Sequence, residues 1–115
     1  TKAIEEPFIV NSNKCLAYHT LENREKELPK NIINKMGNWI AGCDICQEVC
    51  PWNQNNIPST SEPDLQPSEW ILKINKKDAL EWSDSKWKAN LSKSALKRIK
   101  PWMWRRNIDS ISHNK

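Results

Sequence analysis

The sequence is poor in the residues from which cores and phosphate-binding loops are usually built. Leu, Ile, Val and Phe account for 23 of its 115 residues, close to the fifth below which chains often fail to form a core. Two glycines argue against collagen, a Gly-rich phosphate loop and a dinucleotide-binding fingerprint. Any core must therefore draw on the seven tryptophans and four cysteines as well.

Long apolar runs are also missing. No segment approaches the roughly 20 apolar residues that a bilayer span needs. Residues 1–15 lack the basic segment followed by an apolar one that opens a signal peptide. We therefore expect a cytoplasmic protein with no membrane partner, and a first residue other than Met leads us to expect a piece of a longer chain.

Acidic residues are absent from one long stretch. The net charge is only +4, but residues 86–106 carry eight basic side chains and no acidic one, which indicates an anionic partner. Trp87, Trp102 and Trp104 lie within this basic stretch. Such aromatics could stack on unpaired RNA bases, or they could face inward from a solvated cationic helix. The sequence slightly favours the inward orientation.

The hydrophobic pattern predicts a mainly α fold of short helices and loops. Pro and Gly divide the periodic segments from one another, and no convincing period-2 strand is visible. A loop or short extended segment is expected at the N-terminus, and a long loop over residues 53–68. The expected helices cover residues 15–24, 29–37, part of 43–50, 70–74, 79–82, 95–99 and 102–111.

The four cysteines carry the most specific pattern. Cys43 and Cys46 form a C-x2-C pair, and Cys46-x3-Cys50-Pro51 matches the end of the bacterial ferredoxin run C-x2-C-x2-C-x3-C-P. Ile40 stands where that run has its first cysteine, and Cys15 is the only other one. In two-cluster proteins the last cysteine ligates the other cluster. The spacing therefore predicts Cys15, Cys43 and Cys46 on one cluster and Cys50 on a second.

Three other interpretations of the cysteines compete with this one. C-x2-C is also half of a zinc site, although Cys15 and Cys50 form no second such pair. A thioredoxin-like redox pair would need a βαβ context, which the pattern does not show. Two disulfides would need an oxidising compartment, to which nothing in the sequence points. The ending x3-Cys-Pro favours iron–sulfur over zinc.

The segment around the cysteines resembles a known family. Residues 36–53 read M-G-N-W-I-A-G-C-D-I-C-Q-E-V-C-P-W-N, which is similar to the second cluster motif of epoxyqueuosine reductases. Trp39 stands where that family commonly has Arg. Further likeness to the family covers residues 1–4, 13–23, 94–100 and 105–108.

The resemblance implies an oxidoreductase that reduces epoxyqueuosine to queuosine in transfer RNA. Members of this family use two 4Fe-4S clusters, which receive electrons from an external donor, and a cobalamin. The resemblance assigns Cys15, Cys43 and Cys46 to the second cluster and Cys50 to the first. Each cluster would be completed by cysteines upstream of Thr1. Cobalamin would be bound mainly by an N-terminal region that is also missing, so we expect the isolated chain to be inactive, and monomeric.

The resemblance also suggests contacts for other residues. Asp44 and Ile45 lie in the cluster turn, which faces cobalamin in the family, although Asp44 could instead cap a short helix. His19 and His113 are single histidines to which we assign no ligand role. The proposed phosphate contacts with transfer RNA are Lys97, Arg98, Lys100, Arg105 and Arg106.

Together these patterns predict three parts. Residues 1–53 form a ferredoxin-like, two-cluster segment, residues 54–67 a linker that holds Pro58 and Pro63, and residues 68–115 a small helical basic region. The alternative functions are a stand-alone ferredoxin-type electron-transfer module and a zinc-stabilised RNA-binding module.

Overall fold

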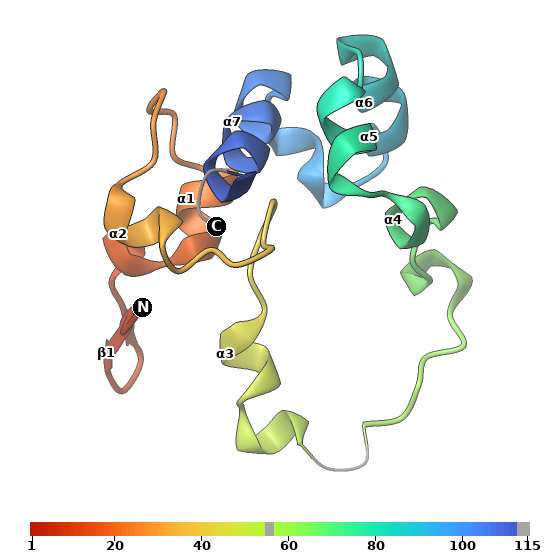
Figure 1. Ribbon diagram of the computed structural model, residues 1–115. Coiled ribbons are helices and arrows are strands. Elements are labelled where there is room, and N and C mark those ends of the chain that lie inside the picture. Colours follow the sequence, from red (N-terminus) through yellow and green to blue (C-terminus); the bar gives the residue numbers. More distant parts are fainter. Residues whose placement is uncertain (55–56, 113–115) are drawn as a thin grey trace.

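Short helices dominate the computed structural model, which describes residues 1–54 and 57–112 (Figure 1). The mainly α prediction is therefore confirmed. His113 and part of the predicted linker lie outside the described residues. The elements are β1 (Ile4–Glu6), β2 (Ile9–Val10), η1 (Ser12–Lys14), α1 (Leu16–Leu21), α2 (Lys30–Ile33), α3 (Ile45–Glu48), η2 (Pro51–Asn53), η3 (Pro63–Leu65), α4 (Glu69–Lys73), α5 (Lys76–Glu81), α6 (Asp84–Leu91), η4 (Ala95–Arg98) and α7 (Pro101–Ser112).

A small hairpin opens the chain where we expected a loop or extended segment. β1 and β2 pair antiparallel, with Ile4 opposite Val10. Phe8 lies in the connecting turn with a φ of 67°, a backbone conformation that residues other than Gly rarely adopt. The two strands hold only three and two residues, too few for an alternating pattern to be visible in the sequence.

Helix α6 was not predicted as a separate element. Only Trp87 and Leu91 of this helix are buried in the core. Its apolar face is therefore too narrow to give a clear helical pattern in the sequence. A local signal was present nonetheless, because the Ser83 hydroxyl accepts the backbone N–H of Lys86 at 3.2 Å, as an N-cap does. Ser68 occupies the N-cap position of α4, but its side chain makes no capping hydrogen bond there.

Helix α7 contributes side chains to both hydrophobic clusters of the protein. Residues of α7 pack with α5, α6 and Ile99 on one side, while its Ile111 packs with residues of α1 and α2 on the other. Figure 1 shows α7 between these two groups of helices. The larger cluster buries Ala79, Trp82, Trp87, Leu91, Ile99, Met103, Trp104 and Ile108.

Tryptophans supply much of the volume that aliphatic residues do not. The rings of Trp82 and Trp104 stack with their centroids 5.8 Å apart, and Trp70 meets Trp82 edge-on at 5.3 Å. The Trp104 indole N–H donates to the carbonyl of Ala79 at 3.0 Å, which removes the cost of burying that polar group. The inward orientation is thus confirmed for Trp87 and Trp104.

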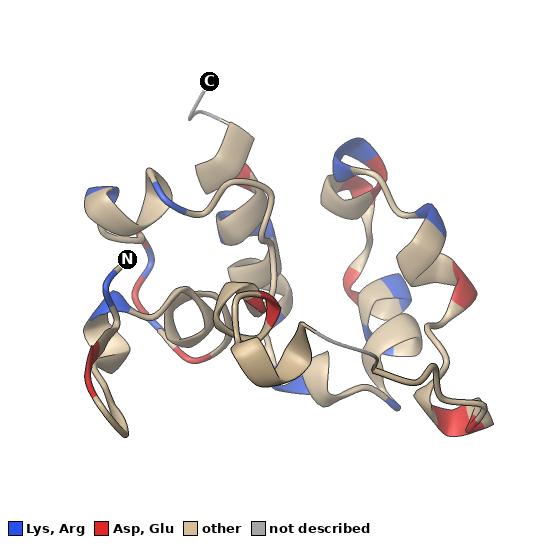
Figure 2. Ribbon diagram, turned by 90° about the horizontal axis from the view of Figure 1, so that it is seen from below, with Lys and Arg blue, Asp and Glu red and all other residues tan. Residues whose placement is uncertain are grey.

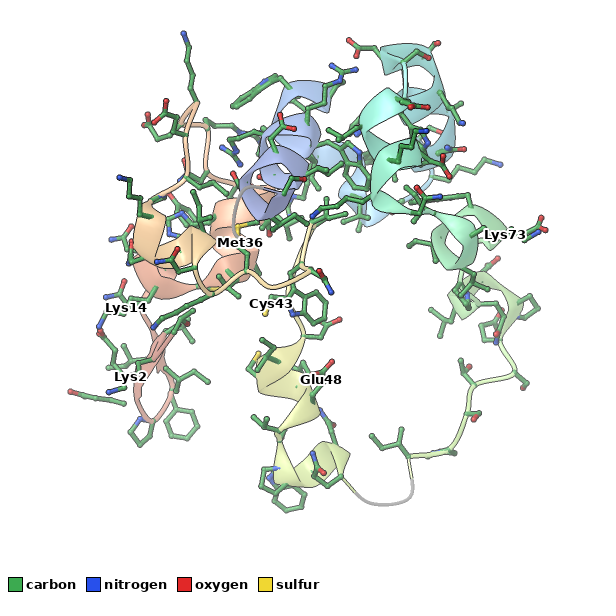
Figure 3. The ribbon with its side chains drawn as sticks, in the orientation of Figure 1. Lys2, Lys14, Met36, Cys43, Glu48 and Lys73 are labelled. Carbon is green, nitrogen blue, oxygen red and sulfur yellow. The ribbon has the colours of Figure 1, made fainter. Side chains whose placement is uncertain are left out.

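The segment around α3 extends away from these clusters (Figures 1 and 3). The radius of gyration is 15.4 Å, against about 13 Å expected for a compact domain of roughly this length. The side chains of Val49 and Trp52 are 68% and 91% exposed. The part that carries Cys46 and Cys50 therefore gains little support from the core. Among the described residues, no helix has the length and apolar character to cross a membrane.

Candidate metal centre

Cys15 lies at the junction of η1 and α1, in the N-cap position of α1. Its backbone N–H donates to the carbonyl of Ser12 at 3.0 Å and its carbonyl accepts from the N–H of His19 at 3.2 Å, so the backbone at this thiol is held on both sides. The ring of His19 is buried and bonded at both nitrogens, to the carbonyl of Asn13 and the amide of Asn23, at 2.9 Å each. Both ring nitrogens of His19 are therefore engaged by hydrogen bonds within the protein.

Gly42 shapes the approach to the second cysteine pair. Its φ is +75°, a left-handed conformation that glycine adopts without strain. Its backbone N–H donates to the hydroxyl of Thr20 at 3.0 Å, and Thr20 is fully buried on α1. This bond joins the loop before Cys43 to the helix that begins after Cys15. The two thiol-bearing segments, 22 residues apart at the bond, are thereby fastened together.

A single helical turn carries the next cysteine, Cys46, which is a predicted cluster ligand. The carbonyl of Asp44 accepts hydrogen bonds from the N–H groups of Gln47 and Glu48 at 2.8 Å each, and these bonds form the first turn of α3. Cys46 lies in this turn and is exposed. The side-chain amide of Asn53 donates back to the carbonyl of Gln47 at 3.0 Å. Asn53 thus closes the turn after Pro51, and Cys50 lies within the segment that this bond closes.

All four cysteines are free thiols, three of them half-buried and Cys46 exposed. Their chemistry fits iron–sulfur ligation, since such clusters are held by cysteine thiolates. Their described geometry does not yet enclose a metal: within residues 1–54 and 57–112, no group of three His, Cys, Asp or Glu side chains is gathered closely enough. The residue types therefore fit a cluster, although the thiols are not drawn together around one. Figure 3 shows Cys43 on the loop above α3.

The two residues proposed to face cobalamin are solvent-accessible. Asp44 and Ile45 both begin the α3 turn and are exposed. Asp44 occupies the N-cap position, yet its side chain makes no capping hydrogen bond. Its carboxylate is thus not engaged at the helix start, and the proposed cofactor contact stays a prediction.

A buried row of hydrogen-bonded polar side chains, here called the polar seam (Arg106 and Asn107), joins α7 to the cysteine-bearing segments. The sequence pattern did not predict it. The side-chain amide N–H groups of Asn107 donate to the carbonyls of Thr20 and Ile40 at 2.9 and 2.8 Å. Its side-chain oxygen accepts from Arg106. Asn107 is fully buried, so these partners replace water. The signal available in the sequence was an adjacent Arg–Asn pair on the apolar side of a helix.

Arg106 is not placed for the phosphate contact that we predicted. It is only 9% exposed, and its five N–H donors are used inside the protein. They meet the carbonyls of His19, Asn23 and Glu25 and, twice, the side-chain oxygen of Asn107. Burial lowers the pKa of this guanidinium, and the nearby charge of Arg24 lowers the pKa further. We therefore leave Arg106 out of the proposed RNA contacts.

The other four predicted cations lie at the surface. Arg105 is bonded to the carbonyl of Trp82 and the carboxylate of Asp84. Arg98 is paired with Glu22 at 2.9 Å. The side chains of Lys97 and Lys100 are exposed. Figure 2 shows basic and acidic positions interspersed along most of the chain rather than one unbroken basic face.

Comparison with known proteins agrees with the cysteine pattern. Residues 1–53 match the family model of the 4Fe-4S double cluster binding domain. The chain is 82% identical to an epoxyqueuosine reductase of Prochlorococcus marinus (strain NATL2A) over 112 residues, which cover 97% of this chain and 36% of that relative. No solved structure matches.

More distant relatives carry the same name. An epoxyqueuosine reductase of Synechococcus sp. (strain CC9605) is 56% identical over 93% of this chain and 33% of its own length. One from Cellulophaga algicola is 42% identical over 96% of this chain and 36% of its own length. The chain thus spans about a third of the length of these curated relatives, and over nearly all of its own residues it is similar to them.

Proposed function

We propose that this chain is the cluster-binding and RNA-contacting portion of an enzyme that reduces epoxyqueuosine to queuosine in transfer RNA. The observation that supports this most strongly is the run from Cys43 to Pro51 together with Cys15. When bound, the 4Fe-4S clusters supply one-electron transfer from an external donor toward cobalamin. Cobalamin would be held mainly by residues outside this chain, and the enzyme would act in the cytoplasm.

In this proposal the chain's own residues hold and orient the cofactors. Cys15, Cys43 and Cys46 ligate one cluster and Cys50 ligates the other. The bond from Gly42 to Thr20 keeps the first two thiol-bearing segments together. Asp44 and Ile45 face cobalamin from the start of α3.

The proposed contacts with transfer RNA use surface cations. Phosphate oxygens are bound by Lys97 and Lys100. Arg98 and Arg105 also bind phosphate oxygens, through the N–H groups that their ion pairs leave unused. Contacts of this kind position the RNA without reading its sequence, and they weaken as salt rises because bound counterions are released. Transfer RNA affinity should therefore fall steeply with ionic strength.

Anaerobic purification of the full-length protein, with the upstream residues that the proposal requires to complete both clusters, followed by metal and sulfide analysis, tests the proposal. We expect iron and acid-labile sulfide, with little zinc, and two EPR signals after reduction, one for each cluster. Cys15→Ser, Cys43→Ser and Cys46→Ser should each remove the same EPR signal. Cys50→Ser, a matched change, should spare that signal and alter the other one. If all four variants removed the same EPR signal, the assignment of Cys50 to a different cluster from the other three cysteines would be contradicted.

The outcome also separates the alternative functions. Stoichiometric zinc without iron or sulfide would indicate the zinc-stabilised RNA-binding module. Intact clusters in a protein that exchanges electrons but does not bind transfer RNA would indicate the ferredoxin-type electron-transfer module.

A further inference from the structure

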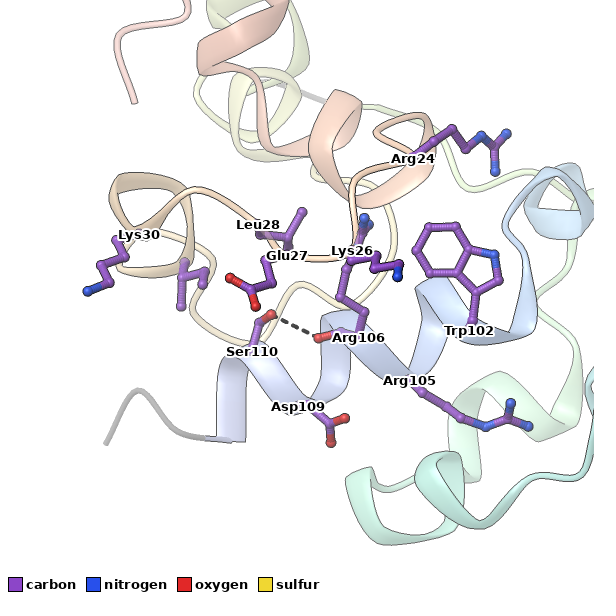
Figure 4. A pocket seen from close by; sticks show the side chains of 11 residues that line it. Arg24, Lys26, Glu27, Leu28, Lys30, Trp102, Arg105, Arg106, Asp109 and Ser110 are labelled. Carbon is purple, nitrogen blue, oxygen red and sulfur yellow. Dashed lines mark hydrogen bonds between the residues drawn. The ribbon is translucent and has the colours of Figure 1, made fainter.

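A groove runs between the loop that follows α1 and one side of α7. Its volume is about 910 Å³, within the range of roughly 300–1,000 Å³ that ligand pockets occupy. Most of its lining is apolar, with Leu28 and Ile33 on one side and Trp102 on the other. Figure 4 shows Trp102 at one end, among Arg24, Lys26 and Arg105. None of the four cysteines lines it.

Trp102 differs from the tryptophans of the core. Trp82, Trp87 and Trp104 are buried in the core, whereas the side chain of Trp102 is 41% exposed. The guanidinium carbon of Arg106 lies 5.4 Å from its ring centroid. That guanidinium has all its N–H donors engaged within the fold, so it supports the ring as a fixed cation–π partner. The indole is thereby held in place while part of it remains open to a ligand.

The charge of the groove is predominantly positive. Arg24 donates to the carbonyl of Arg98 and to the sulfur of Met103, so no carboxylate of the described residues neutralises it. Lys26 and Lys30 likewise form no ion pair within the described part of the chain. The acidic lining residues are Glu27 and Asp109.

We propose that this groove binds one unpaired nucleotide of an RNA, with its base stacked on Trp102 and its phosphate beside Lys26 and Lys30. The proposal rests on the RNA-binding part of the proposed function and adds a site for it. Stacking on an aromatic ring and contact between phosphate and cations are two interactions by which proteins commonly bind single-stranded RNA.

The neighbouring basic stretch favours RNA over an acidic peptide. Arg24 bonds to the carbonyl of Arg98, so the groove begins where residues 97–100 end. A chain of phosphates could pass from Lys97 and Lys100 to the cations of the groove. An acidic peptide would meet the same cations, but it has no planar base to place on Trp102.

Fluorescence anisotropy with two labelled RNAs tests the proposal on the purified protein. One RNA is a stem–loop with an unpaired loop, and the other is a blunt duplex of equal length. Trp102→Leu should weaken stem–loop binding about tenfold and leave duplex binding unchanged. Trp102→Phe should retain most of the affinity, because the aromatic ring remains. Trp52→Leu is the matched control, since Trp52 is exposed and lies outside the groove.

A second variant tests the phosphate contacts without touching the ring. Lys26→Gln combined with Lys30→Gln should reduce the slope of log affinity against log salt by about 1–2 for the stem–loop. Lys2→Gln with Lys73→Gln provides a charge-matched control elsewhere on the surface. Circular dichroism checks that every variant is folded.

The results distinguish this site from the broader proposal. If the stem–loop binds and Trp102→Leu leaves its affinity unchanged, the groove proposal is overturned while RNA binding stands. An equal loss for stem–loop and duplex would also overturn it. If neither RNA binds the unaltered protein, the RNA-binding part of the proposed function fails as well. Binding of polyglutamate in place of RNA would assign the groove to an acidic peptide.

Discussion

The side-chain amide of Asn107 donates to the backbone carbonyl of Ile40 across 2.8 Å, joining α7 to the loop that carries Cys43. The two residues are 67 positions apart in sequence. The helix of the basic C-terminal region therefore supports the predicted ligand loop directly. The same amide also bonds to the carbonyl of Thr20, so one side chain fastens α1 and the ligand loop to α7.

Asn107→Leu should destabilise the protein by at least about 2 kcal/mol, because buried carbonyls and Arg106 donors lose their partner. Urea denaturation followed by circular dichroism measures the change. Ser112→Ala is the control, since Ser112 is exposed on the same helix and bonds only to its own turn. A loss no larger than that of the control would show that the seam contributes little.

Thr20→Val should loosen the ligand loop. Valine has nearly the shape of threonine but cannot accept the N–H of Gly42, and leaving that partly buried amide unbonded costs about 1–3 kcal/mol. Thr20→Ser keeps the hydroxyl and serves as the matched control. We expect Thr20→Val to retain less iron than Thr20→Ser during gel filtration under anaerobic conditions. Equal iron retention would argue that the bond does not hold the loop.

Gly42→Ala should cost about 1–2 kcal/mol through backbone strain alone. A Cβ at this position would meet no atom within 4 Å, so steric overlap adds nothing. The φ of +75° accounts for the cost. Thermal unfolding gives the measurement, and an unchanged or raised midpoint temperature would contradict the left-handed turn before Cys43.

The N-terminal hairpin should weaken at acid pH. A hydrogen bond from Lys14 at 2.6 Å, aided by one from Asn11, lowers the pKa of Glu5 below its ordinary value of 4.5. Because the unfolded chain then binds the proton more readily, this contribution to stability is present above pH 4.5 and lost as pH falls through the lowered pKa.

An NMR titration of the Glu5 carboxyl carbon tests this, with Lys14→Gln as comparison. The titration midpoint should move up toward 4.5 in the variant. The same midpoint in both proteins would show that Lys14 is not the cause.

The sequence was sufficient to predict what depends on local spacing. Helix ends at Pro29, Pro51 and Pro101 follow from the fixed φ and missing donor of proline, and α7 has a regular apolar face. The Cys43–Pro51 run is also local, so its turn and short helix could be predicted from their order alone. The mainly α fold follows from these elements.

What depends on distant partners could not be predicted. The charge pattern gave Arg106 and Lys97 equal weight as RNA contacts, because sequence spacing does not reveal which cation turns inward. Only the fold brings the carbonyls of His19 and Asn23 to Arg106. The groove at Trp102 depends on the loop after α1 crossing α7, a contact between residues that are far apart in the sequence.

Iron and sulfide analysis of the full-length protein, purified anaerobically with the upstream residues that complete both clusters in the proposal, tests the central claim most directly when it is combined with EPR of the reduced protein and of its Cys43→Ser and Cys50→Ser variants. The proposal predicts iron and acid-labile sulfide in equal amounts, and two distinguishable signals of which each variant removes or alters a different one. Stoichiometric zinc without iron or sulfide would contradict the proposal.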